Sequence, residues 1–186
     1  MAESYFADQT FKGVKSIQIG DFENCHFINC ILPNSDLSDI SFVECEFENC
    51  DFSSSKLYDT SFKSVFFIES KLVGLRFEEC NEFLFSIDFR SCYLNLSSFY
   101  QMNPQGISFR ECNLKEVDFT EAELAETLFE KCNLNSAIFK NTNLEKANFR
   151  SAYNFLIDPE INNIQKTKFS LMGLPGLLDK YDLEIE

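Results

Sequence analysis

Large apolar residues recur at every fifth position along most of this 186-residue chain. Stepping by five from Phe22 reaches Phe or Leu at 12 successive positions, ending at Phe77. The frame then slips by two residues, restarts at Leu84 and continues through 14 positions to Phe149. Of these 26 positions only Pro104 is neither Phe nor Leu, and together they hold 15 of the 22 Phe. A repeat this regular decides the fold before any other feature is considered.

A second column of residues lies two positions before each large one, and its members are mostly small. Before the slip the column reads Cys25, Cys30, Ser35, Ile40, Cys45, Cys50, Ser55, Thr60, Val65 and Ser70. After the slip it includes Cys92, Ser97, Ile107, Cys112, Val117, Ala122, Thr127, Cys132, Ala137, Thr142 and Ala147. The other three positions of each repeat are mostly polar, which predicts that one large and one small residue point inward.

A period of five fits neither an α-helix nor a flat strand. Five residues turn a helix by about 140° and would scatter the Phe around its axis. In a strand five is odd, so successive Phe would point to opposite faces. The pattern is satisfied when the chain turns a corner every five residues, so that four sides close a coil of about 20 residues and coils stack at about 4.8 Å.

Comparing every fourth repeat tests this four-sided coil. Each resulting column keeps its own residue type, as neighbours in a stack should. The columns are Phe89, Phe109, Phe129 and Phe149; Leu94, Leu114 and Leu134; Phe99, Phe119 and Phe139; and Leu84, Leu124 and Leu144. The expected fold is therefore all-β, a quadrilateral β-helix.

Copies such as Cys112-Asn113-Leu114-Lys115-Glu116 and Ala147-Asn148-Phe149-Arg150-Ser151 carry the motif A(D/N)LXX. In this motif the chain resembles the pentapeptide-repeat family over residues 20–154. The resemblance implies a right-handed β-helix, and it is nearest to the Qnr, mycobacterial fluoroquinolone-resistance and microcin-immunity branch, whose members bind DNA gyrase.

Two irregularities interrupt the repeat. One is the frame slip at residues 78–83, and the other is the segment 101–106 around Pro104. Proline donates no ladder hydrogen bond, so it marks a corner or a bulge. Each place is interpreted either as a loop used in recognition or as a tolerated defect at a corner.

Both ends of a solenoid need covering, because they expose unpaired backbone and apolar core. Residues 1–19 are expected to form an N-terminal cap and residues 155–186 a C-terminal one. A short α-helix is predicted in the C-terminal cap, because four of its residues share one helical stripe: Leu174, Leu177, Leu178 and Tyr181. They are expected to cover the last core layer, to form a dimer contact, or both. The tail resembles the ending through which members of the same branch form a head-to-head homodimer.

No catalytic or metal site is expected. The single histidine, His26, precedes Phe27 and should point outward. All eight Cys fall in the small inward column, at spacings of five or its multiples rather than those of zinc sites. The start of the chain has no secretion signal and no stretch has the ~20 apolar residues that cross a bilayer. We therefore expect a cytoplasmic protein with reduced cysteines, no cofactor, no metal and no enzymatic activity.

The formal net charge is −14, from 30 acidic and 16 basic residues. Residues 1–85 hold 15 acids and 6 bases, net −9, against 15 and 10, net −5, in the remainder. Such a surface repels nucleic acid, so direct nucleic-acid binding is not expected, nor is membrane binding. Solubility alone is one reading of this charge, and a partner with a basic groove is the other.

Two functions remain open. In the first, which the resemblance favours, an acidic rod about 33 Å long imitates DNA and occupies the basic DNA groove of a type II topoisomerase, DNA gyrase or topoisomerase IV, protecting it from quinolones or a peptide toxin. The candidate contacts are Asp21, Glu23, Asp36, Asp39, Glu44, Glu46, Glu48, Asp51 and Asp59. In the second, the rod is a protein–protein interaction scaffold with a partner unrelated to DNA topology.

Overall fold

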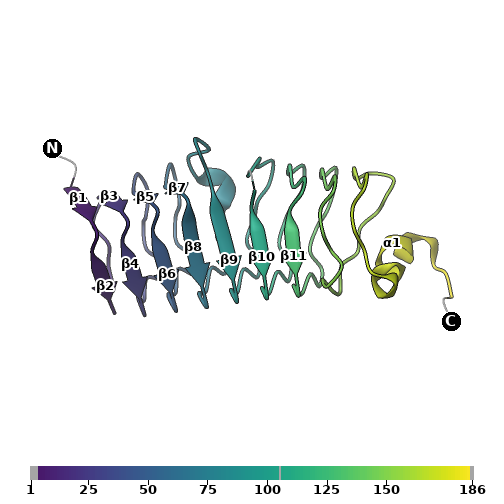
Figure 1. Ribbon diagram of the computed structural model, residues 1–186, viewed down its shortest axis with the longest axis horizontal. Coiled ribbons are helices and arrows are strands. Elements are labelled where there is room, and N and C mark those ends of the chain that lie inside the picture. Colours follow the sequence, from purple (N-terminus) through teal and green to yellow (C-terminus); the bar gives the residue numbers. More distant parts are fainter. Residues whose placement is uncertain (1–3, 105, 185–186) are drawn as a thin grey trace.

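The computed structural model describes residues 4–104 and 106–184 as a rod of stacked coils with a short helical segment at its C-terminal end (Figure 1). One parallel sheet contains four strands, in the order β1 (Ser4–Ala7), β3 (Gly20–Glu23), β5 (Ser41–Val43) and β7 (Ser61–Lys63). The other contains seven, in the order β2 (Thr10–Lys12), β4 (His26–Ile28), β6 (Glu46–Glu48), β8 (Val65–Ile68), β9 (Ile87–Arg90), β10 (Ser108–Arg110) and β11 (Leu128–Glu130). The predicted quadrilateral β-helix is confirmed.

Four sides run along the rod, and each is named here by its ladder. Side 1 carries the four-stranded sheet and side 2 the seven-stranded sheet. Side 3 is a series of single parallel bridges between successive coils. The first bridge joins Ile31 to Asp51 and the last joins Asn133 to Tyr153. Side 4 is a similar series that begins with Asp36 and Lys56. Most partners lie one full coil apart in the sequence, so each coil takes its backbone hydrogen bonds from the coils on either side of it.

The corner residues explain why the period is five. Many residues other than glycine have a positive φ angle, and most of them recur at every fifth position along the chain. Examples are Asn24, Asn29 and Asn34, with φ angles of 49–56°. The left-handed conformation costs an L-residue about 1–2 kcal/mol, and Asn and Asp tolerate it best. Each corner turns the chain onto the next side, so the next large residue points inward again.

Phenylalanine rings stack along the rod in the core. The ring centroids of Phe89 and Phe109 are 5.2 Å apart with the planes inclined by only 3°, and Phe109 and Phe129 follow at 5.3 Å and 12°. Rings on neighbouring sides meet edge to face, as Phe109 and Phe119 do at 5.9 Å and 73°. Both geometries are favourable for aromatic pairs. The interior is thus a set of continuous ring columns rather than a mixed apolar core.

The small column is small because its members lie against the backbone of the preceding coil. The Thr60 hydroxyl donates to the Leu37 carbonyl oxygen at 2.8 Å, and the Cys132 thiol lies 3.3 Å from the Phe109 carbonyl oxygen. All eight cysteines are free and buried. Burial raises the pKa of the Cys45 and Cys112 thiols to about 12, so they remain protonated and unreactive at neutral pH.

The parallel ladder extends beyond residues 20–154 at both ends. Strand β1 pairs with β3, and β2 pairs with β4. The paired residues are fewer positions apart in the sequence than in a full coil, and Phe6 lies beside Phe22 and Phe11 beside Phe27. At the other end Asn148 pairs with Lys168. The segments expected as caps therefore also contribute ladder residues, and Val14 and Ile17 cover the first core layer.

The C-terminal segment folds over the last layer as η2 (Leu171–Gly173), α1 (Pro175–Leu178) and η3 (Asp179–Tyr181). Two glycines allow it to approach Phe155 closely. A Cβ on Gly173 would lie 2.8 Å from the Phe155 ring, and one on Gly176 would lie 2.2 Å from the Phe155 carbonyl oxygen. The Ile157 N–H then donates to the Gly176 carbonyl oxygen at 2.9 Å. The predicted short C-terminal helix is confirmed.

The frame slip differs from its prediction. Leu84, expected as the inward residue, is 65% exposed, and Phe85 is buried in its place at 6%. The Asn81 N–H still bonds to the Thr60 carbonyl oxygen, and the Ser86 N–H bonds to that of Phe62. Residues 82–84 are therefore a three-residue insertion, separated from η1 (Phe77–Glu79) by Cys80 and Asn81, and the corner residue that should follow Ser86 is omitted. Three residues gained and one lost give the two-residue slip.

Neighbouring phenylalanines of β8 provide a test of the ring columns. Phe67 is 2% exposed and stacks 4.8 Å from Phe47, whereas Phe66 is 47% exposed. We expect Phe67→Ala to lower the free energy of unfolding by about 3–5 kcal/mol because it opens a cavity. Phe66→Ala should cost less than about 1 kcal/mol. Urea denaturation monitored by circular dichroism measures both, and equal losses would contradict the assigned alternation.

Candidate interaction surface

The nine acidic residues expected to contact a partner do not form one patch. They lie in the N-terminal half of the rod but are distributed over all four sides. Asp21 and Glu23 belong to β3 on side 1, and Glu46 and Glu48 to β6 on side 2. Asp51 is part of the side 3 ladder, and Asp36 of the side 4 ladder. Asp39, Glu44 and Asp59 occupy positive-φ corners.

Four of these acids lie at the end of β3, at the corner between side 1 and side 2, and along β6 on side 2. We call this group the acidic corner: Glu23, Glu44, Glu46 and Glu48. Among the described residues no Lys or Arg lies within 4.0 Å of their carboxylates. Glu23 accepts a hydrogen bond from the Tyr5 hydroxyl at 2.6 Å, and Glu46 lies 3.7 Å from His26 Nδ1. The acidic corner is therefore a solvent-facing negative patch without a balancing Lys or Arg.

Several acids on sides 3 and 4 instead have partners within the chain. Asp36 accepts from Ser38 at 2.6 Å and lies 3.6 Å from Lys56, and the Ser38 hydrogen bonds lower the pKa of its carboxyl group. Asp59 accepts from the Asn81 amide at 2.8 Å. A partner would have to displace these contacts, so these acids are weaker candidates than the acidic corner.

Basic residues concentrate on side 2 farther along the rod. Arg90 and Arg110 lie directly opposite each other on β9 and β10, and Lys131 and Arg150 follow. Arg110 lies 3.8 Å from Asp88 and 3.7 Å from Glu130, and Lys131 lies 2.9 Å from Glu111. Side 2 thus changes from acidic at β6 to mixed and basic from β9 onward, a charge gradient along the rod.

Catalytic geometry is not evident in the described residues. His26 is exposed, and its Nδ1 lies 3.7 Å from a carboxylate oxygen of Glu46. The described part of the chain contains no cluster of three His, Cys, Asp or Glu side chains arranged to hold a metal ion. Among the same residues no helix is both long and apolar enough to cross a membrane.

A second candidate surface lies at the C-terminal end. Leu171 and Met172 are 84% and 90% exposed, and Met172 borders a pocket of about 500 Å³ between the last coil and α1. Of the four residues expected here, Leu177 packs against the core and Leu178 is half-buried. Leu174 and Tyr181 remain exposed. Sequence reasoning missed Leu171 and Met172, which precede the predicted helical stripe and share no repeat position with the core.

The C-terminal segment is fixed by one lysine. Lys180 Nζ lies 2.7 Å from both Asp158 Oδ1 and Glu160 Oε2, and the Tyr181 hydroxyl donates to Glu160 at 2.8 Å. Desolvation opposes the charge on Lys180, but the hydrogen bonds to both carboxylates outweigh it and raise the pKa of the ammonium group. The hydrogen bonds from Lys180 lower the pKa of both acids.

A family model described as the pentapeptide repeat region matches residues 40–119 and 82–149. The chain belongs to the pentapeptide repeat family. No curated protein sequence matches it. The family match and the structure together establish the fold of this pentapeptide repeat protein. The surface described above is the evidence that bears on its partners.

Solved structures agree with the fold. A trypsin-treated form of QnrB1, described as a plasmid-mediated fluoroquinolone resistance protein, is 13% identical with a TM-score of 0.64, covering 98% of this chain and all of the other. HetL, described as involved in heterocyst differentiation regulation in the cyanobacterium Nostoc sp. strain PCC 7120, is 13% identical with a TM-score of 0.43, covering 92% and 86%. Identities this low support the shared solenoid fold alone, and the first match carries that support.

Acid should release the C-terminal segment. Asp158 and Glu160 have lowered pKa values in the folded state, so their ion pairs with Lys180 stabilise the segment at pH values above about 4. This contribution is lost as the pH falls through the lowered folded-state values. We expect amide hydrogen exchange in Leu171–Tyr181, corrected for intrinsic rates, to be equal at pH 7 and 5 and faster below about pH 4.

The variant Lys180→Met should loosen the same amides already at pH 5 and remove the acid transition. Lys166→Met, which changes an exposed lysine that forms no ion pair within the described residues, is the matched control. An acid transition that persists in Lys180→Met would show that another group fixes the segment.

Proposed function

We propose that this pentapeptide repeat protein is a non-enzymatic, cytoplasmic DNA mimic that binds a type II topoisomerase, DNA gyrase or topoisomerase IV. By occupying the basic DNA groove it protects the enzyme from quinolones or from a peptide toxin. The acidic corner is the observation that carries the proposal. It presents four carboxylates without Lys or Arg partners at the more acidic end of a rod whose coils repeat at about 4.8 Å.

Two further features support this reading. Unpaired surface carboxylates attract a basic groove over long range and speed its association. The fold is shared with QnrB1, which is described as a fluoroquinolone resistance protein.

A supercoiling assay with gyrase, ciprofloxacin and purified protein tests the proposal at two salt concentrations. We expect protection or inhibition that weakens with salt, because charge drives the contact. Reversing Glu44, Glu46 and Glu48 to Lys should raise the protein concentration required by about tenfold or more. The control reverses Glu116, Glu121 and Glu123, which makes the same change in net charge outside the acidic corner. Absence of any effect on gyrase and topoisomerase IV at micromolar protein would overturn the proposal.

The alternative function is an interaction scaffold with a protein partner unrelated to DNA topology. The charge gradient of side 2 favours it, because Arg90, Arg110 and Arg150 are unlike the uniformly negative surface of DNA. In the same assay a scaffold would leave both enzymes unchanged. It would also keep its partner at high salt if the contact is apolar.

We further propose that two copies form a homodimer through the C-terminal surface. Leu171 and Met172 are adjacent apolar side chains that are almost fully exposed, and the pocket of about 500 Å³ beside Met172 offers space for apolar side chains of a second copy. A head-to-head pair would place the two rods end to end, with one acidic corner toward each outer end of the dimer.

Light scattering tests this assembly. Leu171→Glu and Met172→Glu should convert the dimer to a monomer, because each would bury an unpaired carboxylate in the contact. Tyr58→Glu, at a residue 68% exposed and far from the C-terminal surface, should remain dimeric. A wild-type protein that is monomeric at micromolar concentration would contradict the proposal.

A further inference from the structure

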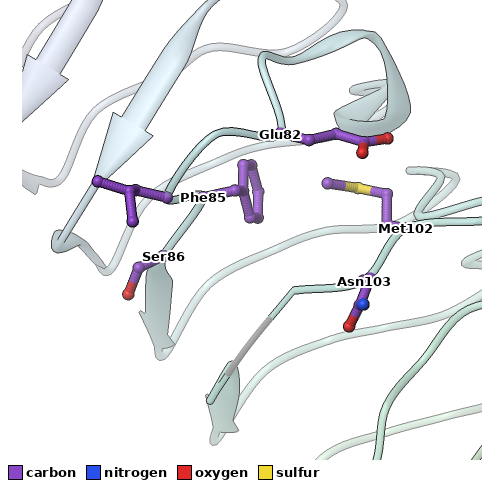
Figure 2. Close-up of a pocket in the computed structure, with 6 residues that line it drawn as sticks. Glu82, Phe85, Ser86, Met102 and Asn103 are labelled. Atoms are coloured by element: carbon purple, nitrogen blue, oxygen red, sulfur yellow. The ribbon is translucent and has the colours of Figure 1, made fainter.

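Side 2 presents an aromatic ring that a partner can reach. Phe66 of β8 is 47% exposed there. The pocket of about 530 Å³ beside residues 82–84 differs in this respect (Figure 2). Its Phe85 ring and Met102 thioether point toward one another but are only 6% and 2% exposed. These two side chains are therefore not available to a partner, whereas the ring of Phe66 is.

Strand β8 is the middle strand of the seven on side 2, with three strands on either side of it. Its outward residues are apolar, the exposed Phe66 and the half-buried Ile68. In the outward column of Ile68, the ladder places Glu48 one coil earlier and Arg90 one coil later. The face thus has an apolar centre, with an acid on one side of it and a base at the same distance on the other.

The outermost strands of the same sheet repeat this relation with the signs exchanged. Lys12 lies in the same outward column on β2, three strands before β8, and Glu130 lies on β11, three strands after it. At these two distances from β8, one strand and three strands, the charges in this column are therefore opposite across the centre.

Glu48 and Arg90 have no ionic partner of their own. Both residues are exposed, and within residues 4–104 and 106–184 neither forms an ion pair. At the ladder spacing of about 4.8 Å they lie about 10 Å apart along the rod, with Ile68 between them. Unpaired opposite charges at equal distances from an apolar centre are the pattern of a self-complementary contact.

We propose that side 2 binds side 2 of a second copy of this chain, with β8 facing β8. A half-turn about an axis that runs along β8, midway between the two faces, reverses the order of the coils and keeps the direction of the strands. Phe66 then faces Phe66, and Glu48 of each copy faces Arg90 of the other. Toward the ends, Lys12 of each copy faces Glu130 of the other. A two-fold contact makes each of these charge pairs twice.

One row of this arrangement brings like charges together, because Glu46 faces Asp88. Each of these acids has a neighbour in its own chain that offsets part of the repulsion. His26 Nδ1 lies 3.7 Å from Glu46. Asp88 accepts a hydrogen bond from the Ser108 hydroxyl and lies 3.8 Å from Arg110. The row is therefore a smaller obstacle than two bare carboxylates would be.

A second copy fits this face better than a partner with charges of one sign. A basic surface would attract Glu48 but would be repelled by Arg90 only two strands away, and an acidic surface would meet the reverse difficulty. Side 2 itself supplies the required change of sign. The seven strands span about 29 Å and each is three or four residues long, and a face this small predicts a weak association, with a dissociation constant on the order of 100 µM.

Sedimentation velocity measures this pairing in a chain that carries Leu171→Glu and Met172→Glu, so that the C-terminal surface does not contribute. Between about 5 and 300 µM we expect a reversible dimer that salt weakens. Glu48→Arg alone, or Arg90→Glu alone, should raise the dissociation constant at least about tenfold, because each creates two like-charged contacts. Both changes together exchange the charges and should restore the constant to within about threefold of the starting value.

Three further variants complete the test. Phe66→Ala should leave the circular dichroism spectrum unchanged and weaken the dimer at least about tenfold, since the ring is outside the core but at the centre of the contact. Glu116→Arg and Lys140→Glu make the same charge changes away from side 2 and should leave the dissociation constant unchanged. A chain that stays monomeric at about 300 µM, or a charge exchange that restores nothing, would overturn the proposal.

The gyrase assay gives an independent result. Pairing covers Glu46 and Glu48 of the acidic corner, whereas Arg90→Glu prevents pairing without removing any of its carboxylates. A dimer that responds to these variants, with no effect of the protein on gyrase or topoisomerase IV, would retain the pairing and reject the DNA mimic. Protection of gyrase by a chain that stays monomeric at about 300 µM would retain the DNA mimic and reject the pairing.

Discussion

Each coil of this protein depends on its neighbours for its backbone hydrogen bonds. Only short strands and single bridges join successive coils, and nearly all partners lie one full coil apart in the sequence. A segment of this length cannot satisfy its own backbone, so stability is shared along the rod. The stacked Phe rings follow from the same constraint, because the ladder spacing of about 4.8 Å is also a favourable distance between offset rings.

The fold was predictable because its cause is periodic. A corner every five residues, an inward Phe or Leu and a small residue two positions earlier appear directly in the sequence, and the structure confirms the four-sided coil. The frame slip was harder. Leu84 and Phe85 are both large and apolar, and the step of five selects Leu84. Which of them points inward depends on the Ser86–Phe62 hydrogen bond and on a corner residue that is missing, and neither is visible as a pattern.

The candidate surface was less predictable than the core. Sequence position gives the sides on which Glu46 and Asp51 lie, but it does not show which acids are paired. Asp36 and Asp59 have partners one coil away, whereas Glu44 and Glu48 have no Lys or Arg nearby among the described residues. Leu171 and Met172 were overlooked because exposure at the end of a solenoid depends on how the chain folds back. That path is set by the close contact of Gly173 and Gly176 with Phe155.

The insertion at residues 82–84 has a consequence for how such a rod can change. It adds three residues within side 1, between the positions that Ser61 and Phe62 occupy one coil earlier, and the omission of one corner residue shortly afterwards returns the chain to its original phase. By β9 the Phe67 and Phe89 rings are again stacked, 5.7 Å apart. Length variation is therefore confined to one coil, and the remaining sides keep their residues. A solenoid of this kind can acquire a projecting loop on one side without redesign of its interior, so new contacts and the inherited core can evolve separately.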